Sequence, residues 1–331
     1  MVVTYNVALC SSSSYFASRI GELCGQLDLS YFLVQPVWVG EFLHKLQAGQ
    51  IEVEVLIDMA ADLYAPDDPY LQLAREVKKR RGYVIDDPDN GAIMAHKGRF
   101  HQILVDNQIP VPETVIVPRS EVESFRLDDA ARARLGVPFV VKPGWGGGGL
   151  GVNVEGRSEQ DLKDAAVKCP ASDSFLIQER VTPRKLDSHY GWFRVFFVLG
   201  EVIPCWWEPP ANQYQLVSPL QRRMYKLAPL SRIVRDIGRV SRMKFFSTEV
   251  CLAEDGKFVA VDYLNTDPDM SPKSFYPTGV PDEVIRHIAW LLVEEAVRVA
   301  RRRQGFFDEE LEERDLDWDY RRRRGLLVPG E

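Results

Sequence analysis

Five glycines within six residues follow a short apolar strand, and they constrain the fold more than any other stretch of the chain. The segment reads VVKPGWGGGGLGV over residues 140–152, with Lys142 near the end of the incoming strand. A dinucleotide-binding glycine motif needs a helix that opens at its last glycine, but the residues that follow, VNVEG, predict a strand. A Walker A loop needs GK[ST] after its glycines, and this is absent. The sequence therefore predicts a glycine loop between two antiparallel strands.

A loop of this kind can close over a polyphosphate. Backbone N–H groups without side chains can approach phosphate oxygens, and a lysine on the preceding strand adds a positive charge. The alternative is a glycine-rich hairpin tip that binds no ligand. The candidate phosphate-binding residues are Lys142, Gly146, Gly147, Gly148 and Gly149.

A second hairpin, STEVCLAEDGKFVAVDYLN (residues 247–265), carries two carboxylates. Its DG pair is typical of a two-residue type I′ turn, and pairing across that turn places Glu249 opposite Asp262. Facing carboxylates repel each other unless a cation lies between them. Asn265 adds a neutral oxygen, and oxygen ligands without His or Cys suit Mg²⁺. The hairpin therefore predicts a magnesium site, with two solvent-exposed acids on an edge hairpin as the alternative.

The order of predicted elements indicates an α/β chain with several parts. Residues 1–95 alternate strands and helices, which predicts a small N-terminal domain with a mostly parallel sheet. Residues 96–181 form a subdomain that holds the glycine loop. Residues 182–305 form another, with the carboxylate hairpin, a loop over residues 208–220 and a long final helix. Residues 306–331 read as a charged, solvated tail, with a basic partner or nucleic-acid patch as the alternative.

Composition excludes several classes of function. The chain has 331 residues, with 41 Lys and Arg against 48 Asp and Glu, a formal net charge of −7. This charge argues against nucleic acid or an anionic membrane as partner, and no apolar window is long enough to span a bilayer. Five scattered cysteines without a CxxC pair argue against a zinc site and favour a reducing compartment. Because the N-terminus also lacks a signal-peptide pattern, we expect a cytoplasmic protein.

The order of the segments resembles the ATP-grasp superfamily over about residues 96–265. HKGRFHQILVDNQIPVPETVIV resembles its lysine-bearing helix and the extension after it, and FVVKPGWGGGGLGV resembles its second lysine strand and phosphate-covering loop. FLIQERV resembles its adenine-contacting strand, WFRVFFVLGEV its arginine-bearing hairpin, and EVCL…FVAVDYLN its magnesium hairpin. Among the branches, the chain looks like the glutathione synthetase, D-alanine–D-alanine ligase and ribosomal-protein-glutamate-ligase group. The resemblance implies an α/β (α+β) fold, with a Rossmann-like N-terminal domain and two α+β subdomains that clasp the nucleotide.

The resemblance also implies roles for individual residues. Two lysines would hold the ATP phosphates and two residues would line the adenine pocket, namely Lys97, Lys142, Glu179 and Val181. One or two Mg²⁺ ions, or Mn²⁺ in their place, would be held by Glu249, Asp262 and Asn265. The catalytic residues would be Lys142 and Arg194, the arginine facing the reacting phosphate.

The chain departs from the family pattern at two places. The family usually has Glu-x-Asn at the end of the magnesium strand, whereas this chain has Asp262-Tyr-Leu-Asn265, so either a bulge restores the geometry or Asn265 is displaced. Many members carry an acid two residues before the arginine, and here that position is Trp192. The pair Trp206-Trp207 stands where relatives often have polar or basic residues, and we expect it in the core or an interface rather than on a substrate platform.

The activity that the resemblance implies is an ATP- and Mg²⁺-dependent carboxylate–amine ligase acting through an acyl phosphate. Its partners would be ATP and small-molecule or peptide carboxylate and amine substrates, with homo-oligomer formation left open. One alternative is a small-molecule kinase of ATP-grasp type, although thirteen acidic against seven basic residues within 1–95 disfavour a polyanionic substrate. A second alternative, which the altered magnesium motif and Trp192 motivate, is a non-catalytic ATP-binding protein. No motif identifies the substrate.

Overall fold

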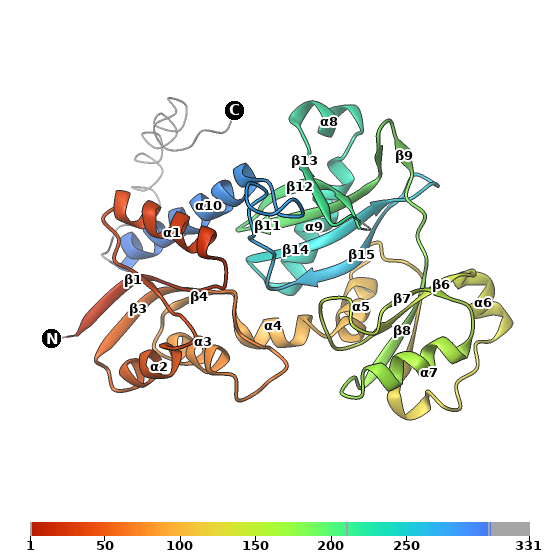
Figure 1. Ribbon diagram of the computed structural model, residues 1–331, viewed down its shortest axis with the longest axis horizontal. Helices are drawn as coiled ribbons and strands as arrows, with labels where there is room; N and C mark the ends of the chain where they lie inside the picture. The colour runs from red at the N-terminus through yellow and green to blue at the C-terminus, as the bar shows by residue number, and fades with distance from the viewer. Residues whose placement is uncertain (1, 210, 304, 306–331) are drawn as a thin grey trace.

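The computed structural model describes residues 2–209, 211–303 and 305, which form three units built on separate sheets. Figure 1 shows the N-terminal unit in red and orange beside a five-stranded sheet in green and blue, with a yellow-green unit next to that sheet. The predicted tail, residues 306–331, lies outside the described residues. Within the described part of the chain, no helix has the length and apolar character needed to cross a bilayer.

The N-terminal unit contains a parallel sheet, as its alternating strands and helices predict. The order is β2-β1-β3-β4, and each neighbouring pair is parallel. The strands are β1 (Val3–Cys10), β2 (Tyr31–Leu33), β3 (Ile51–Asp58) and β4 (Tyr83–Ile85). The helices are α1 (Ser14–Gln26), α2 (Val39–Gln47), α3 (Pro69–Lys79) and α4 (Pro88–Met94). Strand β2 is too short for alternation to predict it.

A half-buried acid at the end of β3 makes the stability of this unit depend on pH. Oδ1 of Asp58 accepts hydrogen bonds from the backbone N–H groups of Ala60 and Ala61 at 3.0 and 3.2 Å. Burial raises the pKa of Asp58 from 3.8 to about 7. The folded chain therefore binds a proton that the unfolded chain releases, so the contribution of Asp58 to the free energy of unfolding falls as pH rises through this interval.

Asp58→Asn keeps the acceptor oxygen and removes the ionisation. Between about pH 4 and pH 7, we expect the free energy of unfolding to fall less in the variant than in the wild-type protein. Denaturant unfolding of both proteins at several pH values measures this difference. Parallel pH profiles for the two proteins would contradict the assignment.

The second unit is an antiparallel sheet of order β5-β8-β6-β7. Its strands are β5 (Thr114–Pro118), β6 (Phe139–Pro143), β7 (Asn153–Gly156) and β8 (Ser174–Glu179). Its helices are α5 (Lys97–Asp106), α6 (Asp129–Leu135) and α7 (Glu159–Lys168), with a 3₁₀ turn at Arg119–Glu121. Strands β6 and β7 flank the glycines and pair with each other, which confirms the predicted strand–loop–strand arrangement. Ser158 and Asp161 form a capping box at the start of α7.

The third unit is an antiparallel sheet of order β13-β12-β11-β14-β15. Its strands are β11 (Trp192–Val198), β12 (Glu201–Glu208), β13 (Gln213–Leu216), β14 (Phe245–Leu252) and β15 (Phe258–Asn265), preceded by the small ribbon β9 (Lys185–Leu186) and β10 (His189–Tyr190). Its helices are α8 (Pro219–Met224), α9 (Ala228–Ser241) and α10 (Asp282–Arg303). The expected loop over residues 208–220 is wrong, because β13 forms there. Tyr214 pairs with Trp207 across the sheet, and their rings lie 4.5 Å apart.

The turn of the carboxylate hairpin also differs from the prediction. The backbone N–H of Ala253 donates to the carbonyl of Lys257 at 2.8 Å, so three residues form the turn instead of two. Gly256 has a φ of 87°, the left-handed conformation that three-residue hairpin loops place at their last position. The predicted type I′ turn is therefore wrong.

One face of the five-stranded sheet packs against helices, and the other face is shared between a hydrophobic core and the candidate site. One face packs against α5 and α9 through a core that includes Phe193, Val195 and Phe246. On the opposite face, Phe196 and Val198 belong to a core shared with α1 and α10. The rest of that face carries polar side chains, and the candidate site lies there.

Candidate active site

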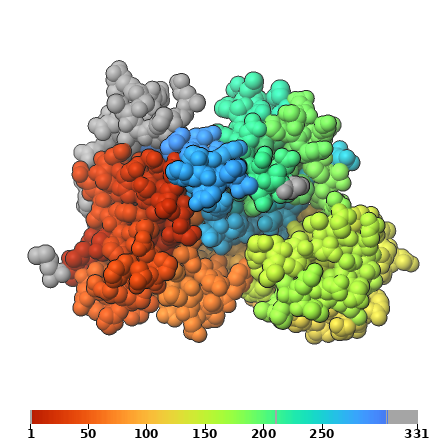
Figure 2. Space-filling view, in the orientation of Figure 1, coloured from red at the N-terminus to blue at the C-terminus, as the bar shows by residue number. Residues whose placement is uncertain are grey.

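A cavity of about 1160 Å³ is lined by both antiparallel sheets. Figure 2 shows the yellow-green unit directly below the green and cyan unit that contributes the other wall. The cavity wall includes the predicted residues Lys97, Lys142, Gly146, Gly147, Gly148, Gly149, Glu179, Val181, Glu249 and Asp262. Two further predicted residues, Arg194 and Asn265, are not part of this wall. Segments that are far apart in sequence therefore meet at one place.

The carboxylate pair of the cavity wall is aligned by a bulge. Glu249 pairs with Asp262, as predicted, although the adjacent pair is Val250 with Ala260. Val261 is thus an extra residue on β15, and this bulge compensates for the longer turn. Its carbonyl accepts a hydrogen bond from Nζ of Lys142 at 2.8 Å. The bulge therefore aligns the two acids and brings a lysine beside them.

A second change of register places Asn265, whose position relative to the carboxylates the Asp-x-x-Asn spacing leaves open. Ser247 pairs with Asn265 and Glu249 with Asp262, so two steps on β14 match three on β15. Ser247 and Glu249 share a face because they are two residues apart, and their partners share it with them. Asn265 therefore lies on the carboxylate face, where its Oδ1 also accepts the N–H of Asp267 at 3.2 Å.

Two donors hold the carboxylate of Glu249. Nη2 of Arg194 lies 3.0 Å from Oε1, and Nε1 of Trp192 donates to Oε2 at 2.8 Å. The guanidinium of Arg194 also lies over the ring of Trp207, 5.1 Å from its centroid. Burial raises the pKa of Glu249, the charge of Arg194 opposes this, and Asp262 adds to it. Arg194 is not part of the cavity wall, but it contacts Glu249, which is.

These residues fit a hard divalent cation. The donors are two carboxylates and an amide oxygen, without His or Cys, which is the set that Mg²⁺ prefers. No three His, Cys, Asp or Glu side chains gather into a metal site anywhere in the described ranges. A cation between Glu249 and Asp262 would therefore need further oxygens from a ligand, as Mg²⁺ does when it binds substrate phosphates.

The glycine loop opens on the same cavity. The side chain of Lys97, the first residue of α5, donates to the carbonyl of Gly146. Gly146 has a φ of 124°, and Gly151 combines a φ of 72° with a site where a Cβ would lie 2.4 Å from the sulfur of Cys169. Other residues would be strained at both positions. The loop between them carries only glycines and Leu150, and its exposed residues Gly147, Gly148 and Gly149 have no side chains that would keep a ligand away from the backbone.

The chain is similar to known proteins in its fold. No protein-family model and no curated protein matches the chain. An ATP-grasp ligase PsnB, complexed with precursor peptide PsnA2 and AMPPNP, is 12% identical over 88% of this chain and 96% of that chain, with a TM-score of 0.58. A RimK domain ATP-grasp protein from Sphaerobacter thermophilus is 19% identical over 86% and 98% of the two chains, also with a TM-score of 0.58. A D-alanine–D-alanine ligase from Bacillus anthracis, complexed with ATP, is 12% identical over 92% of this chain and 99% of that chain, with a TM-score of 0.59.

The chain has the ATP-grasp fold. The same comparisons confirm the α/β (α+β) class and the resemblance that the motifs indicate. The cavity wall includes Glu179 at the end of β8, Val181 just after it, and apolar side chains such as Val140 and Val154. An aromatic base of a nucleotide can pack against such a wall.

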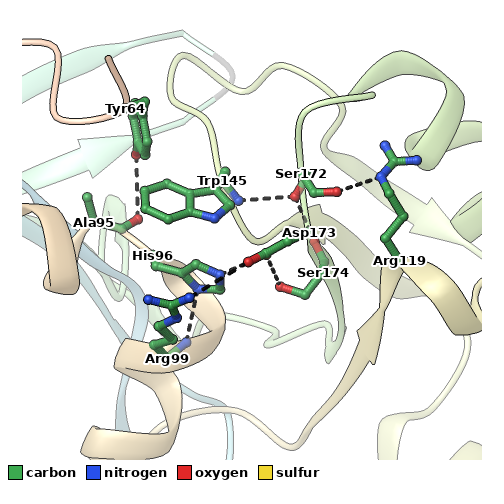
Figure 3. A network of polar contacts seen from close by, with 9 residues as sticks. All are labelled: Tyr64, Ala95, His96, Arg99, Arg119, Trp145, Ser172, Asp173 and Ser174. Carbon is green, nitrogen blue, oxygen red and sulfur yellow. Dashed lines mark hydrogen bonds and ion pairs between the residues drawn. The ribbon is translucent and has the colours of Figure 1, made fainter. Parts of the chain in front are cut away.

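A network at the base of the glycine loop connects it to the start of α5 (Figure 3). The backbone N–H of Trp145 donates to Oγ of Ser172 at 3.2 Å, and its ring contacts His96 and Tyr64 edge-on at 4.7 and 4.8 Å. Tyr64 belongs to the N-terminal unit, so the loop is anchored to two units at once.

His96 caps the helix that begins with Lys97. Its Nδ1 accepts the backbone N–H of Arg99 at 3.1 Å, so the proton lies on Nε2, which donates to Asp173 at 2.8 Å. His96 is only 3% exposed. The sequence alone gives it no role, because histidine is not a typical N-cap residue and Asp173 is 77 residues away.

A buried hydroxyl joins three elements of the site. Tyr263, between Asp262 and Asn265 on β15, accepts a hydrogen bond from Nε2 of Gln178 on β8 at 2.7 Å. Nδ1 of His101 on α5 lies 2.7 Å from the same hydroxyl. Burial, together with the charge of Lys142, lowers the pKa of His101 to about 4. The imidazole is therefore neutral at pH 7, and the tyrosine hydroxyl can donate to it.

Tyr263→Phe would leave Gln178 and His101 without this partner inside the protein. We expect the free energy of unfolding to fall by about 1–3 kcal/mol, because unpaired buried polar groups retain their desolvation cost. Tyr225→Phe is the matched control, because it removes an exposed hydroxyl that binds Asp187. Denaturant unfolding measures both variants, and equal effects would contradict the role of Tyr263 as a buried junction.

Aromatic residues also line the cavity. Trp206 and Trp207 are 3% and 8% exposed, and both contribute to the wall. The ring of His189 stacks on Trp206 at 4.5 Å. The tryptophan pair is thus buried, as expected: Trp206 belongs to the core on the α5 and α9 face of the sheet, and Trp207 to the core on the face that carries Arg194.

Proposed function

We propose that this chain is an ATP- and Mg²⁺-dependent carboxylate–amine ligase. The observation that carries the proposal is the convergence in one cavity of two lysines, a glycine loop and a facing carboxylate pair. The first two suit a polyphosphate, and the third suits the Mg²⁺ that accompanies it. The fold supports the proposal, since the solved structures that share it include ligases bound to AMPPNP or ATP.

Each group has a defined task in the proposed reaction. Lys97 and Lys142 place positive charge at the phosphates, and the glycine loop covers them and excludes water. Mg²⁺, held by Glu249, Asp262 and Asn265, would neutralise charge on the phosphate oxygens during phosphoryl transfer. Arg194, which contacts Glu249 and lies over Trp207, would act on the site through the carboxylate of Glu249.

The proposed chemistry has two steps. The γ-phosphoryl group passes from ATP to a carboxylate oxygen of the substrate, which gives ADP and an acyl phosphate. An amine then attacks the acyl carbon, forms the C–N bond and releases phosphate. The substrates are a small-molecule or peptide carboxylate and an amine, and they would bind in the same cavity.

A hydroxylamine assay tests this proposal. The protein is incubated with ATP, Mg²⁺, hydroxylamine and a broad panel of carboxylic acids, and both ADP and hydroxamate are measured. We expect both products to depend on one class of acid. Absence of acid-dependent products across the panel would contradict the ligase. A phosphorylated alcohol would indicate the kinase, and ATP binding without turnover or response to Mg²⁺ would indicate the non-catalytic alternative.

A further inference from the structure

The carboxylate of Glu249 has one protein donor on each oxygen. Arg194 contacts Oε1 at 3.0 Å and the indole N–H of Trp192 contacts Oε2 at 2.8 Å. Trp192 and Arg194 are two residues apart on β11, so both point to the face that carries Glu249. Arg194 lies directly opposite Glu249, and Trp192 lies opposite Cys251. The carboxylate is therefore fixed by two neighbours on a single strand.

The backbone before Trp192 leaves its indole little freedom. The N–H of Gly191 donates to the carbonyl of Arg184 at 2.7 Å, and its carbonyl accepts the N–H of Leu252 at 2.6 Å. A Cβ at Gly191 would lie 2.9 Å from the Leu252 oxygen and 3.1 Å from the Arg184 oxygen. Only glycine allows this close approach of the two backbones. The start of β11, and with it the indole, is thereby held in place.

The donor on Oε2 has a consequence for the orientation of the acid. A guanidinium can take both oxygens of a carboxylate in a bidentate pair, which would turn Glu249 toward Arg194 and away from Asp262. The indole N–H occupies Oε2 instead, so each oxygen has one protein donor and keeps a lone pair for another ligand. The indole is a donor only and carries no charge, so it orients the acid without changing the charge of the site.

We propose that Trp192 is a positioning residue, whose indole N–H orients Glu249 for a divalent cation. The inference rests on the proposed function, because it takes Glu249 and Asp262 as the ligands of Mg²⁺. It assigns a task to the position that distinguishes this chain from the family pattern. Hydrogen bonds to metal-binding side chains typically contribute 10–100-fold to metal affinity.

Trp192→Phe tests the inference, since phenylalanine keeps an aromatic ring and removes the N–H. AMPPNP binding is measured by calorimetry without metal and over a series of MgCl₂ concentrations. We expect the Mg²⁺ concentration that half-maximally tightens AMPPNP binding to rise about tenfold, while metal-free affinity stays within about twofold. Trp290→Phe is the matched control, because Trp290 is a buried tryptophan of α10 outside the cavity wall.

A shift in the Mg²⁺ midpoint no larger in Trp192→Phe than in Trp290→Phe would overturn the inference and leave the proposed function standing. If the affinity of the wild-type protein for AMPPNP does not change with MgCl₂, both the inference and the proposed function are wrong. A second measurement needs no change at Trp192. The chain has seven tryptophans, whose indole N–H groups give separate NMR resonances. The resonance that shifts in Glu249→Ala is assigned to Trp192. We expect the same resonance to shift when MgCl₂ is added to the wild-type AMPPNP complex. If that resonance does not respond to MgCl₂, the inference is wrong.

Discussion

Lys142→Met is expected to lower acid-dependent ATP turnover by about 10²–10³-fold, the usual effect of removing one preorganised electrostatic contact to the reacting group. Nζ of Lys142 is fixed at 2.8 Å from the carbonyl of Val261, beside the carboxylate pair. Burial lowers the pKa of Lys142, whereas Asp262 and Glu249 oppose this by stabilising its charged form. Methionine keeps the unbranched apolar stem and brings no charge to the phosphates.

ADP release under saturating ATP and acid measures this effect. Lys257→Met is the control, because Lys257 lies exposed on the hairpin turn and pairs with Asp255. We expect that variant to keep the wild-type rate. Turnover of Lys142→Met within about threefold of wild type would show that Lys142 does not contact the reacting phosphate.

Glu249→Gln is expected to remove the response of nucleotide binding to Mg²⁺ and to lower turnover by at least about 10²-fold. The amide has one oxygen in place of two. Arg194 and Trp192 both donate to the wild-type carboxylate, so the amide nitrogen must face one of these donors. The variant therefore loses a negative charge and the orientation of the ligand together.

Calorimetry of AMPPNP binding with and without MgCl₂ checks the prediction. Metal-free affinity should be nearly unchanged, because Glu249 is expected to act through the cation rather than on the nucleotide. Glu254→Gln is the control, since Glu254 is an exposed acid on the turn of the same hairpin. A variant of Glu249 that still binds AMPPNP more tightly with Mg²⁺ would exclude this acid as a metal ligand.

The pairing of the two acids shows what local sequence patterns can and cannot predict. Pairing of Glu249 with Asp262 is predicted from a two-residue turn, and the structure confirms the pairing with a three-residue turn. The longer turn displaces the register by one residue, and the bulge at Val261 restores it. Alternation and turn residues predict a hairpin, but they do not predict a bulge, because its unpaired carbonyl needs a partner from elsewhere. Here that partner is Lys142, 119 residues away.

The glycine loop can be predicted from local sequence, whereas the roles of Trp192 and His96 cannot. The glycine loop follows from its own residues, since the flanking strands and the positive φ angles are local properties. The roles of Trp192 and His96 do not, because their partners Glu249 and Asp173 are 57 and 77 residues away. Nothing in a tryptophan or histidine by itself indicates which acid it will contact.

The amino-acid sequence is enough to predict a lysine strand, a glycine loop and an acid-bearing hairpin, together with their order along the chain. Backbone preferences and side-chain alternation act over a few residues, so these elements can form in almost any context. Three features appear only in the folded chain: the elements line one cavity, Asn265 shares the face of Asp262, and Trp192 donates to Glu249. Those contacts depend on how the two antiparallel sheets pack, which is set by cores assembled from distant parts of the chain.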